Sequence, residues 1–235
     1  MATGNANASD TAKKKAPAKK APASVDPAVV EDIVASMVPI PGKDCLMGRF
    51  PVTQAQWEAV MEGNPSEFKG ADRPVEMVSW ADCRAFLEAL NGSPVAKAAG
   101  LSFRLPEEDE WEFACRAGSE GRFCKLADGT EITEDTLAEV AWFDEDVFRG
   151  STHPVGRKKP NAFGLHDMHG NVSEWTDTAV DEDGLADPGG KARVTRGGAW
   201  GGSAKGCASS NRRWFAPSLR SDLLGFRLCA SARAD

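Results

Sequence analysis

The sequence predicts a single α+β domain with few helices, small sheets and many ordered loops. Two observations lead to this prediction. Segments with helix caps and a 3.6-residue apolar period are confined to the first half of the chain. After about residue 119 that period disappears, and Gly, Pro, Asp and Asn separate short apolar stretches as far as the C-terminus. A length of 235 residues suits one hydrophobic core with a tail.

The first 24 residues differ in composition from the rest of the chain. They contain five Lys and a single acid among many Ala and Pro, which predicts a disordered basic tail over residues 1–24. The formal net charge of the whole chain is −7 and that of the tail is +4, so the remaining residues carry −11. An acidic body argues against a nucleic-acid-binding domain. We interpret the tail as a solvated linker, with contact to nucleic acid or to an acidic partner as the alternative.

Apolar runs and cysteines limit the location of the protein. No apolar run approaches the length of a membrane span, and the N-terminus lacks the hydrophobic stretch of a secretory signal. We therefore expect a cytoplasmic or virion-associated protein, and display on a surface stays open. Without a signal and without a C-x-x-C pair, we expect buried thiols and no disulfide framework. The six cysteines are Cys45, Cys83, Cys115, Cys124, Cys207 and Cys229.

The folded part is predicted to begin with a short helix. Residues 25–37 have an amphipathic pattern, and Pro27 suits a first helical turn. Residues 38–50 contain Pro and Gly between apolar stretches, which predicts strand segments broken by turns. We assign 38–235 to the domain itself.

Three further helices are predicted from their capping signals. An oxygen-bearing side chain before an apolar helical stripe satisfies the free N–H groups at a helix start, and acids there interact favourably with the helix dipole. The run of acids at 107–110 is explained in this way and needs no catalytic role. The signals are a Thr53/Gln56 capping box, Ser79 before residues 80–90, and Pro106 with the acids 107–110 and a Gly118 C-cap.

The C-terminal part contains two motifs of structurally restricted residues, and an irregular segment connects them. Arg196-Gly-Gly-Ala-Trp200 and Gly225-Phe-Arg-Leu228 contain residues that fix a backbone and a core. The residues between them follow a period neither of 2 nor of 3.6. A segment of this kind is either a catalytic loop or a display surface.

Five motifs in order give the chain a family resemblance. Together they resemble the formylglycine-generating enzyme, or sulfatase-modifying factor, domain. The resemblance covers nearly all of the chain after residue 45 and implies a C-type-lectin-like fold with small twisted sheets, few helices and many loops. The motifs are residues 48–57, 73–82, 103–118, 161–175, and 196–200 with 225–228.

The resemblance makes the enzymatic activity doubtful for this chain. In the enzymes of the family, two cysteines near the C-terminus bind copper and support an O₂-dependent oxidation of a substrate cysteine. Soft thiolates hold Cu(I) as a pair. The later cysteine of the pair corresponds to Cys207, but the earlier one corresponds to Gly202. We therefore expect no catalytic residues and no required cofactor, copper included, and we interpret Cys207 as a buried structural thiol.

The same fold is used by the variable proteins of diversity-generating retroelements, which the C-terminus resembles more closely. In these proteins adenine-targeted mutagenesis rewrites codons between Arg-Gly-Gly-x-Trp and Gly-Phe-Arg-Leu. Here that variable-type segment is 196–228, with Cys207, Arg212, Trp214, Pro217 and Arg220 as fixed points. The candidate ligand-binding positions are Gly201, Gly202, Lys205, Gly206, Asn211, Arg213, Phe215, Leu219 and Ser221.

The favoured interpretation is a non-catalytic protein whose binding segment, defined as residues 201–221, contacts a protein or another macromolecule. One alternative is an oxidase or accessory protein of the formylglycine-generating type with altered chemistry. Another is a structural subunit that binds a partner through its N-terminal helix.

A loop before these C-terminal motifs resembles a calcium loop of the family. The resemblance implies a side-chain oxygen of Asp167 and the backbone carbonyls of Met168, Gly170 and Val172 as candidate ligands, which are the hard oxygen donors that Ca²⁺ prefers. The alternative is that hydrogen bonds from Asn171 and Glu174 hold the loop.

Overall fold

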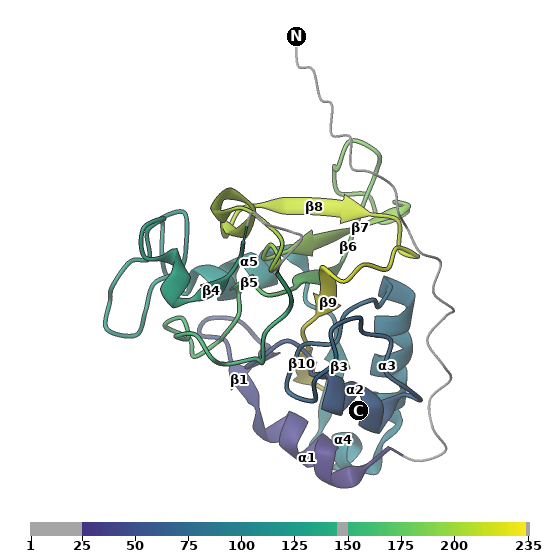
Figure 1. The fold of residues 1–235 in the computed structure, drawn as a ribbon. Coiled ribbons are helices and arrows are strands. Elements are labelled where there is room, and N and C mark those ends of the chain that lie inside the picture. Colours follow the sequence, from purple (N-terminus) through teal and green to yellow (C-terminus); the bar gives the residue numbers. More distant parts are fainter. Residues whose placement is uncertain (1–24, 145–149, 234–235) are drawn as a thin grey trace.

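The computed structural model describes residues 25–144 and 150–233, so the predicted tail over 1–24 lies outside the described residues. Figure 1 shows small sheets flanked by short helices, with long loops between them. The helices are α1 (Pro27–Ala35), α2 (Gln54–Val60), α3 (Trp80–Gly92), α4 (Pro94–Ala98) and α5 (Glu108–Arg116), with 3₁₀ turns η1 (Leu137–Glu139) and η2 (Ala204–Cys207). The strands are β1 (Met37–Pro39), β2 (Leu46–Gly48), β3 (Leu101–Arg104), β4 (Ala141–Trp142), β5 (His169–Gly170), β6 (Ser173–Val180), β7 (Ala192–Arg196), β8 (Arg212–Phe215), β9 (Leu224–Phe226) and β10 (Cys229–Ala232).

The first sheet joins both ends of the described chain. Its strand order is β1-β2-β10-β3, with every pair antiparallel. The last strand, β10, therefore lies in the interior of the sheet between two strands from the N-terminal half. Figure 1 shows β10 beside β3 near the middle of the molecule.

The second sheet carries the variable-type segment. Its order is β8-β7-β6-β9, in which β9 pairs with β6 in parallel and the other pairs are antiparallel. Strand β8 is an edge strand, and Figure 1 places it along the top of the molecule, far from α4 at the bottom. A separate parallel pair, β4 with β5, lies beside this sheet.

The predicted capping signals form the expected hydrogen bonds. Thr53 and Gln56 make a reciprocal capping box at the start of α2. Ser79 caps α3 as predicted, and Asp82 completes a second capping box with it. Helix α5 ends at Arg116, and its C-cap is Ala117, with a left-handed φ of +49°, one residue before the predicted C-cap Gly118. The helices are thus set by local polar contacts at their first turns.

Two hydrophobic clusters cover opposite faces of the first sheet. One contains side chains of α1, α2 and α3 with Phe103 and Ala230, and the other contains Met47 and Cys229 with Trp111 of α5. A fully buried ion pair between Arg227 and Glu174, with an N–O distance of 2.9 Å, lies within this core. The Glu174 carboxylate also accepts a hydrogen bond of 2.6 Å from the indole of Trp111, so the buried charges are hydrogen-bonded.

The observed fold agrees with the predicted α+β, C-type-lectin-like class, and two details differ from the prediction. The expected helix over 25–37 ends at Ala35, because Met37 pairs with Gly48 in the first sheet. Helix α4 was not predicted, although Ser93 caps it and Pro94 occupies its first turn. After residue 119, the described residues contain helical turns only of the 3₁₀ type. Among the helices described, none has the length and apolar character needed to cross a membrane.

Candidate binding surface

A tightly packed turn directly precedes the binding segment. Gly198 has a φ of +71°, and a Cβ at this position would lie 2.7 Å from the Gly206 carbonyl oxygen and 2.9 Å from the Cys207 sulfur. An L side chain rarely adopts such a backbone, and there is no room for one here. The turn is closed further by Trp200, whose indole donates a 3.0 Å hydrogen bond to the carbonyl of Asp222. Both ends of the segment are therefore held together at its base.

Strand β8 separates the expected fixed positions from the expected variable ones. It pairs with β7 so that Arg212 lies opposite Arg196 and Arg213 opposite Thr195. Because side chains alternate along a strand, Arg212 and Trp214 share one face and Arg213 and Phe215 the other. The first pair consists of predicted fixed positions and the second pair of predicted variable ones.

Three arginines anchor the segment to helices α3 and α5. Arg212 donates to both carboxylate oxygens of Glu108, at 2.6 and 2.7 Å. Arg220 donates to both oxygens of Asp82, at 2.8 and 2.9 Å. The fully buried Arg196 pairs with Glu112 and donates a 2.8 Å hydrogen bond to a carbonyl of the segment. Bidentate pairs of this kind fix geometry as well as charge.

The nine candidate positions differ in how far they reach the surface. Lys205 and Arg213 are exposed, and the other seven are partly exposed, so none is fully buried. They lie in the turn leading into η2 and in η2 itself, at the residue before β8 and in the edge strand β8, and in the loop between β8 and β9. The seven partly exposed residues are Gly201, Gly202, Gly206, Asn211, Phe215, Leu219 and Ser221.

Several of these partly exposed side chains also support the segment. Phe215 and Leu219 pack against the main hydrophobic cluster. Asn211 donates a 2.8 Å hydrogen bond from its side chain to the carbonyl of Gly206. Ser221 accepts a hydrogen bond from the backbone N–H of Leu223 and so holds the turn before β9. The freest side chains of the set are Lys205 and Arg213.

Trp214 is both a packing and a surface residue. Its side chain is 37% exposed. A Cβ added to Gly184 would lie 2.7 Å from the indole ring, so the loop between β6 and β7 closely covers one side of it. The Arg212 guanidinium lies over the ring at 5.6 Å.

The position of the family's copper pair does not fit a copper ion in this chain. Gly202 has no side chain to coordinate a metal. Cys207 is fully buried, and burial raises the pKa of its thiol to about 12, so it is protonated at neutral pH. A protonated thiol is a poor nucleophile, and a single thiol opposite a glycine does not make the thiolate pair that holds Cu(I).

The predicted calcium loop is held by hydrogen bonds. Asp167 has a φ of +58°, and its carboxylate accepts from the Gly156 N–H at 2.8 Å and from the Asn171 amide at 3.3 Å. Burial raises the pKa of Asp167. These contacts are those of the hydrogen-bonded alternative, and Glu174 is occupied by Arg227 and Trp111. Calcium binding by Asp167 with the carbonyls of Met168, Gly170 and Val172 stays a prediction.

His169, within the same loop, is a structural residue. Its ring is buried, with Nδ1 2.8 Å from the Cys207 carbonyl oxygen, and Nε2 accepts from the Cys124 N–H at 3.1 Å. Burial lowers the pKa of His169 to about 4. The neutral ring therefore links the loop to the base of the binding segment.

A small pocket beside the segment was not predicted from the sequence. It has a volume of about 320 Å³ and is lined by Trp142, His153 and Trp200 among others. The rings of Trp142 and His153 stack at 3.8 Å between centroids. Burial lowers the pKa of His153. Only Trp200 belonged to a recognised motif, so the sequence contained no local signal for this pocket.

Comparisons with known proteins agree with this architecture. An inactive Cα-formylglycine-generating enzyme 2 from Bos taurus is 33% identical over 199 residues, covering 79% of this chain and 59% of that protein. Chaperone protein LppX from Paenibacillus barcinonensis is 30% identical over 176 residues, covering 56% and 61%. The chain thus spans about three fifths of the length of these curated relatives.

Solved structures show the same relationship. Treponema denticola variable protein 1 superposes with a TM-score of 0.67 at 30% identity, covering 89% of this chain and 93% of that one. PvdO from Pseudomonas aeruginosa has a TM-score of 0.64 at 28% identity, covering 80% of each. The sulfatase-modifying factor enzyme 1-like domain matches residues 30–232, and the chain belongs to this family, with the C-type-lectin-like fold of its formylglycine-generating enzymes and variable proteins.

Proposed function

We propose that this chain is a non-catalytic binding protein whose binding segment, residues 201–221, contacts a protein or another macromolecular ligand. The proposal depends on one observation: some residues of the segment are anchored to the rest of the fold, and others reach the surface. Arg212 and Arg220 are held in bidentate ion pairs, and Cys207 is buried at the base. The nine candidate positions reach solvent to differing degrees. Substitution at those positions changes the surface and leaves the anchors in place.

Diversification of this segment accounts for its mixed chemistry. The 30% identity to a variable protein over 89% of the chain supports a variable protein of a diversity-generating retroelement. Adenine-targeted rewriting of an Asn codon can yield Gly, Ser, Asp, Arg, Phe or Leu, which covers most of the candidate positions. It cannot yield Lys, so Lys205 fits least well.

The altered copper position supports a binding role over oxidation. An oxidase of the formylglycine-generating type would need a copper site that does without a thiol at position 202, and Cys207 is inaccessible at the base of the turn. A Cu(I) titration tests this alternative. Tight binding of one ion per chain, lost in Cys207→Ser, would favour the oxidase.

The genomic neighbourhood provides the first test of diversification. We expect a reverse-transcriptase gene near this gene, together with a near-copy of codons 196–228 that differs from them only where the copy has adenine. Absence of both features would refute diversification and leave a fixed family member.

A second experiment tests the binding surface itself. Peptides selected from a random library on the intact protein serve as the probe, and their affinity is measured for Arg213→Glu and Lys97→Glu. Both substitutions reverse an exposed charge, but Lys97 lies on α4 at the opposite end of the molecule. We expect at least about a tenfold loss, or 1.4 kcal/mol, for Arg213→Glu alone. Equal affinities of the two variants would contradict the proposed surface.

A further inference from the structure

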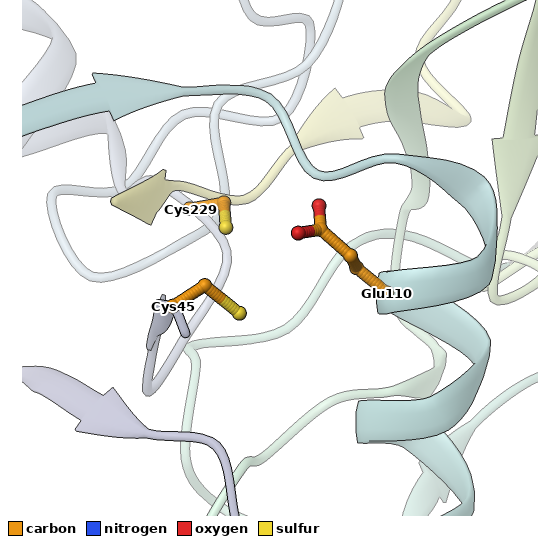
Figure 2. Close-up of side chains that lie close together, drawn as sticks. All are labelled: Cys45, Glu110 and Cys229. Atoms are coloured by element: carbon orange, nitrogen blue, oxygen red, sulfur yellow. The ribbon is translucent and has the colours of Figure 1, made fainter. Parts of the chain in front are cut away.

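Two cysteines and a glutamate from distant parts of the chain meet beside the first sheet. Figure 2 shows the side chains of Cys45, Cys229 and Glu110 directed toward a common space. Their ligand atoms all lie within 4.8 Å of one another. We call this group the thiol–carboxylate cluster. Within the described part of the chain, these three residues are the His, Cys, Asp and Glu side chains whose ligand atoms lie close enough together to bind one metal ion.

The sheet register explains why the two thiols meet. Cys229 on β10 lies opposite Met47 on β2, and Cys45 precedes Met47 by two residues. Cys45 directly precedes β2, and residues two apart in extended chain point to the same side, so Cys45 lies diagonally from Cys229 on that face of the sheet. Arg104 on β3 lies opposite Cys229 and shares the face.

Helix α5 supplies the third group. Its first turn packs over this face of the sheet, and Glu110 is held there by the Arg104 guanidinium at 2.6 and 2.7 Å. The backbone N–H of Glu107 donates a further 2.8 Å hydrogen bond to the same carboxylate. The carboxylate is therefore oriented before any ion arrives. A hydrogen-bonded carboxylate is the usual outer-shell arrangement of a ligating acid.

The donor set suits zinc. Tetrahedral Zn²⁺ accepts Cys sulfur at about 2.3 Å and carboxylate oxygen at about 2.0–2.2 Å, which places two ligand atoms roughly 3.5–3.8 Å apart. The separations within the cluster are compatible with that geometry after small side-chain rotations. Three protein ligands leave the fourth position for water.

Charge balance favours a divalent ion over a monovalent one. Two thiolates and Glu110 carry three negative charges when the site is loaded, and Arg104 carries one positive charge. A divalent cation brings this sum to zero, whereas Cu(I) leaves one uncompensated negative charge in a largely buried site. Cys45 is 7% exposed and Cys229 is fully buried, so an uncompensated charge would be costly there.

We propose that Cys45, Cys229 and Glu110 form a binding site for Zn²⁺, with Arg104 as the residue that positions Glu110. The ion would join the loop before β2, the interior strand β10 and the first turn of α5. This site is separate from Gly202 and Cys207 and does not depend on the proposed binding function.

Co²⁺ is the probe that tests the site, since it replaces Zn²⁺ and its thiolate complexes absorb in the near ultraviolet. The reduced full chain is titrated with Co²⁺ and then with Zn²⁺. We expect one Co²⁺ per chain, a thiolate-to-cobalt charge-transfer band, and loss of the band when Zn²⁺ is added. Cys45→Ser and Cys229→Ser each lose the band. Arg104→Gln keeps the band and weakens Co²⁺ binding about 10- to 100-fold.

Cys83→Ser is the matched control, because Cys83 is also fully buried but lies on α3 away from the cluster. Circular dichroism of each variant checks folding, and Cys45→Ala offers a second, milder substitution at the least buried thiol. A band that survives in the Cys45 and Cys229 variants would overturn the proposal. So would a reduced, folded wild-type chain that binds no Co²⁺.

Discussion

Arg212 and Arg213 are adjacent on β8 and are expected to respond very differently to truncation. The Arg212 guanidinium donates to both oxygens of Glu108 and, at 2.7 Å, to the carbonyl of Gly184. Arg213 is exposed, and its side chain has no hydrogen bond or ion pair within the part of the chain that the structure describes. Each substitution to Ala therefore removes an arginine side chain, in one case from an ion pair with Glu108 and in the other from the solvent-exposed surface.

The magnitude follows from the contacts and their exposure. Hydrogen bonds to charged groups contribute roughly 1.5–3 kcal/mol when buried, and exposed ion pairs about 0.2–1 kcal/mol. The Arg212 side chain is 34% exposed and that of Glu108 is 19% exposed, so the pair lies between these limits. We expect Arg212→Ala to lower the free energy of unfolding by about 2 kcal/mol and Arg213→Ala to change it by less than about 0.5 kcal/mol.

Urea unfolding followed by circular dichroism measures both values. With a slope of about 2 kcal/mol/M, the midpoint of Arg212→Ala falls by about 1 M while the slope stays unchanged. A double-mutant cycle with Glu108→Ala isolates the pair, and we expect a coupling of about 1 kcal/mol. If Arg213→Ala destabilises the chain as much as Arg212→Ala does, the division of β8 into an anchoring face and a ligand face is wrong.

Three further predictions concern the base of the segment and its neighbouring loop. A left-handed backbone costs an L residue about 1–2 kcal/mol, and a Cβ at position 198 would also lie 2.7 Å from the Gly206 carbonyl oxygen, so Gly198→Ala should lower the free energy of unfolding by more than this amount. Gly206→Ala is the control: its Cβ would have no neighbour closer than 3.9 Å, and we expect no change in the same urea assay. Burial lowers the pKa of His169 from 6.5 to about 4, so the unfolded chain binds more protons between these values, and stability should fall by about 3 kcal/mol as pH drops through this window. His169→Gln should flatten that slope in urea titrations at several pH values, and an unchanged slope would assign it to other groups. If the 167–172 loop binds calcium, Ca²⁺ at 100 times its Kd should raise the free energy of unfolding by about 2.7 kcal/mol relative to the protein in EDTA, and Asp167→Asn should abolish this increase. Equal melting temperatures in Ca²⁺ and in EDTA would mean that hydrogen bonds alone hold the loop.

The helix starts were predictable because a cap is a local device. Thr53 and Gln56 are three residues apart, and so are the partners at the start of α3, so the sequence contains the whole interaction. The missed helix α4 has only five residues, too few for an apolar period to show. Its cap, Ser93 before Pro94, was the available signal.

The pairing of distant segments could not be predicted in the same way. Nothing near Cys45 or Cys229 in the sequence indicates that β2 and β10 are neighbours, because register depends on the whole sheet. The same holds for the carboxylates that anchor Arg212 and Arg220, which come from two different helices. The spacing of motifs predicts Arg212 and Arg220 as fixed positions, and their ion pairs are visible only in the structure.

The interior position of β10 has a consequence for synthesis. The first sheet cannot close until its last strand has left the ribosome, because β2 and β3 both need β10 as their neighbour. A frameshift or stop codon anywhere in the binding segment removes β9 and β10 and exposes two unpaired strand edges in the N-terminal half. Such a chain fails to fold and is open to proteolysis, whereas an amino-acid exchange in the segment still yields a complete sheet. A complete binding segment is therefore a condition for the first sheet to form, because the segment precedes the strand that joins β2 to β3.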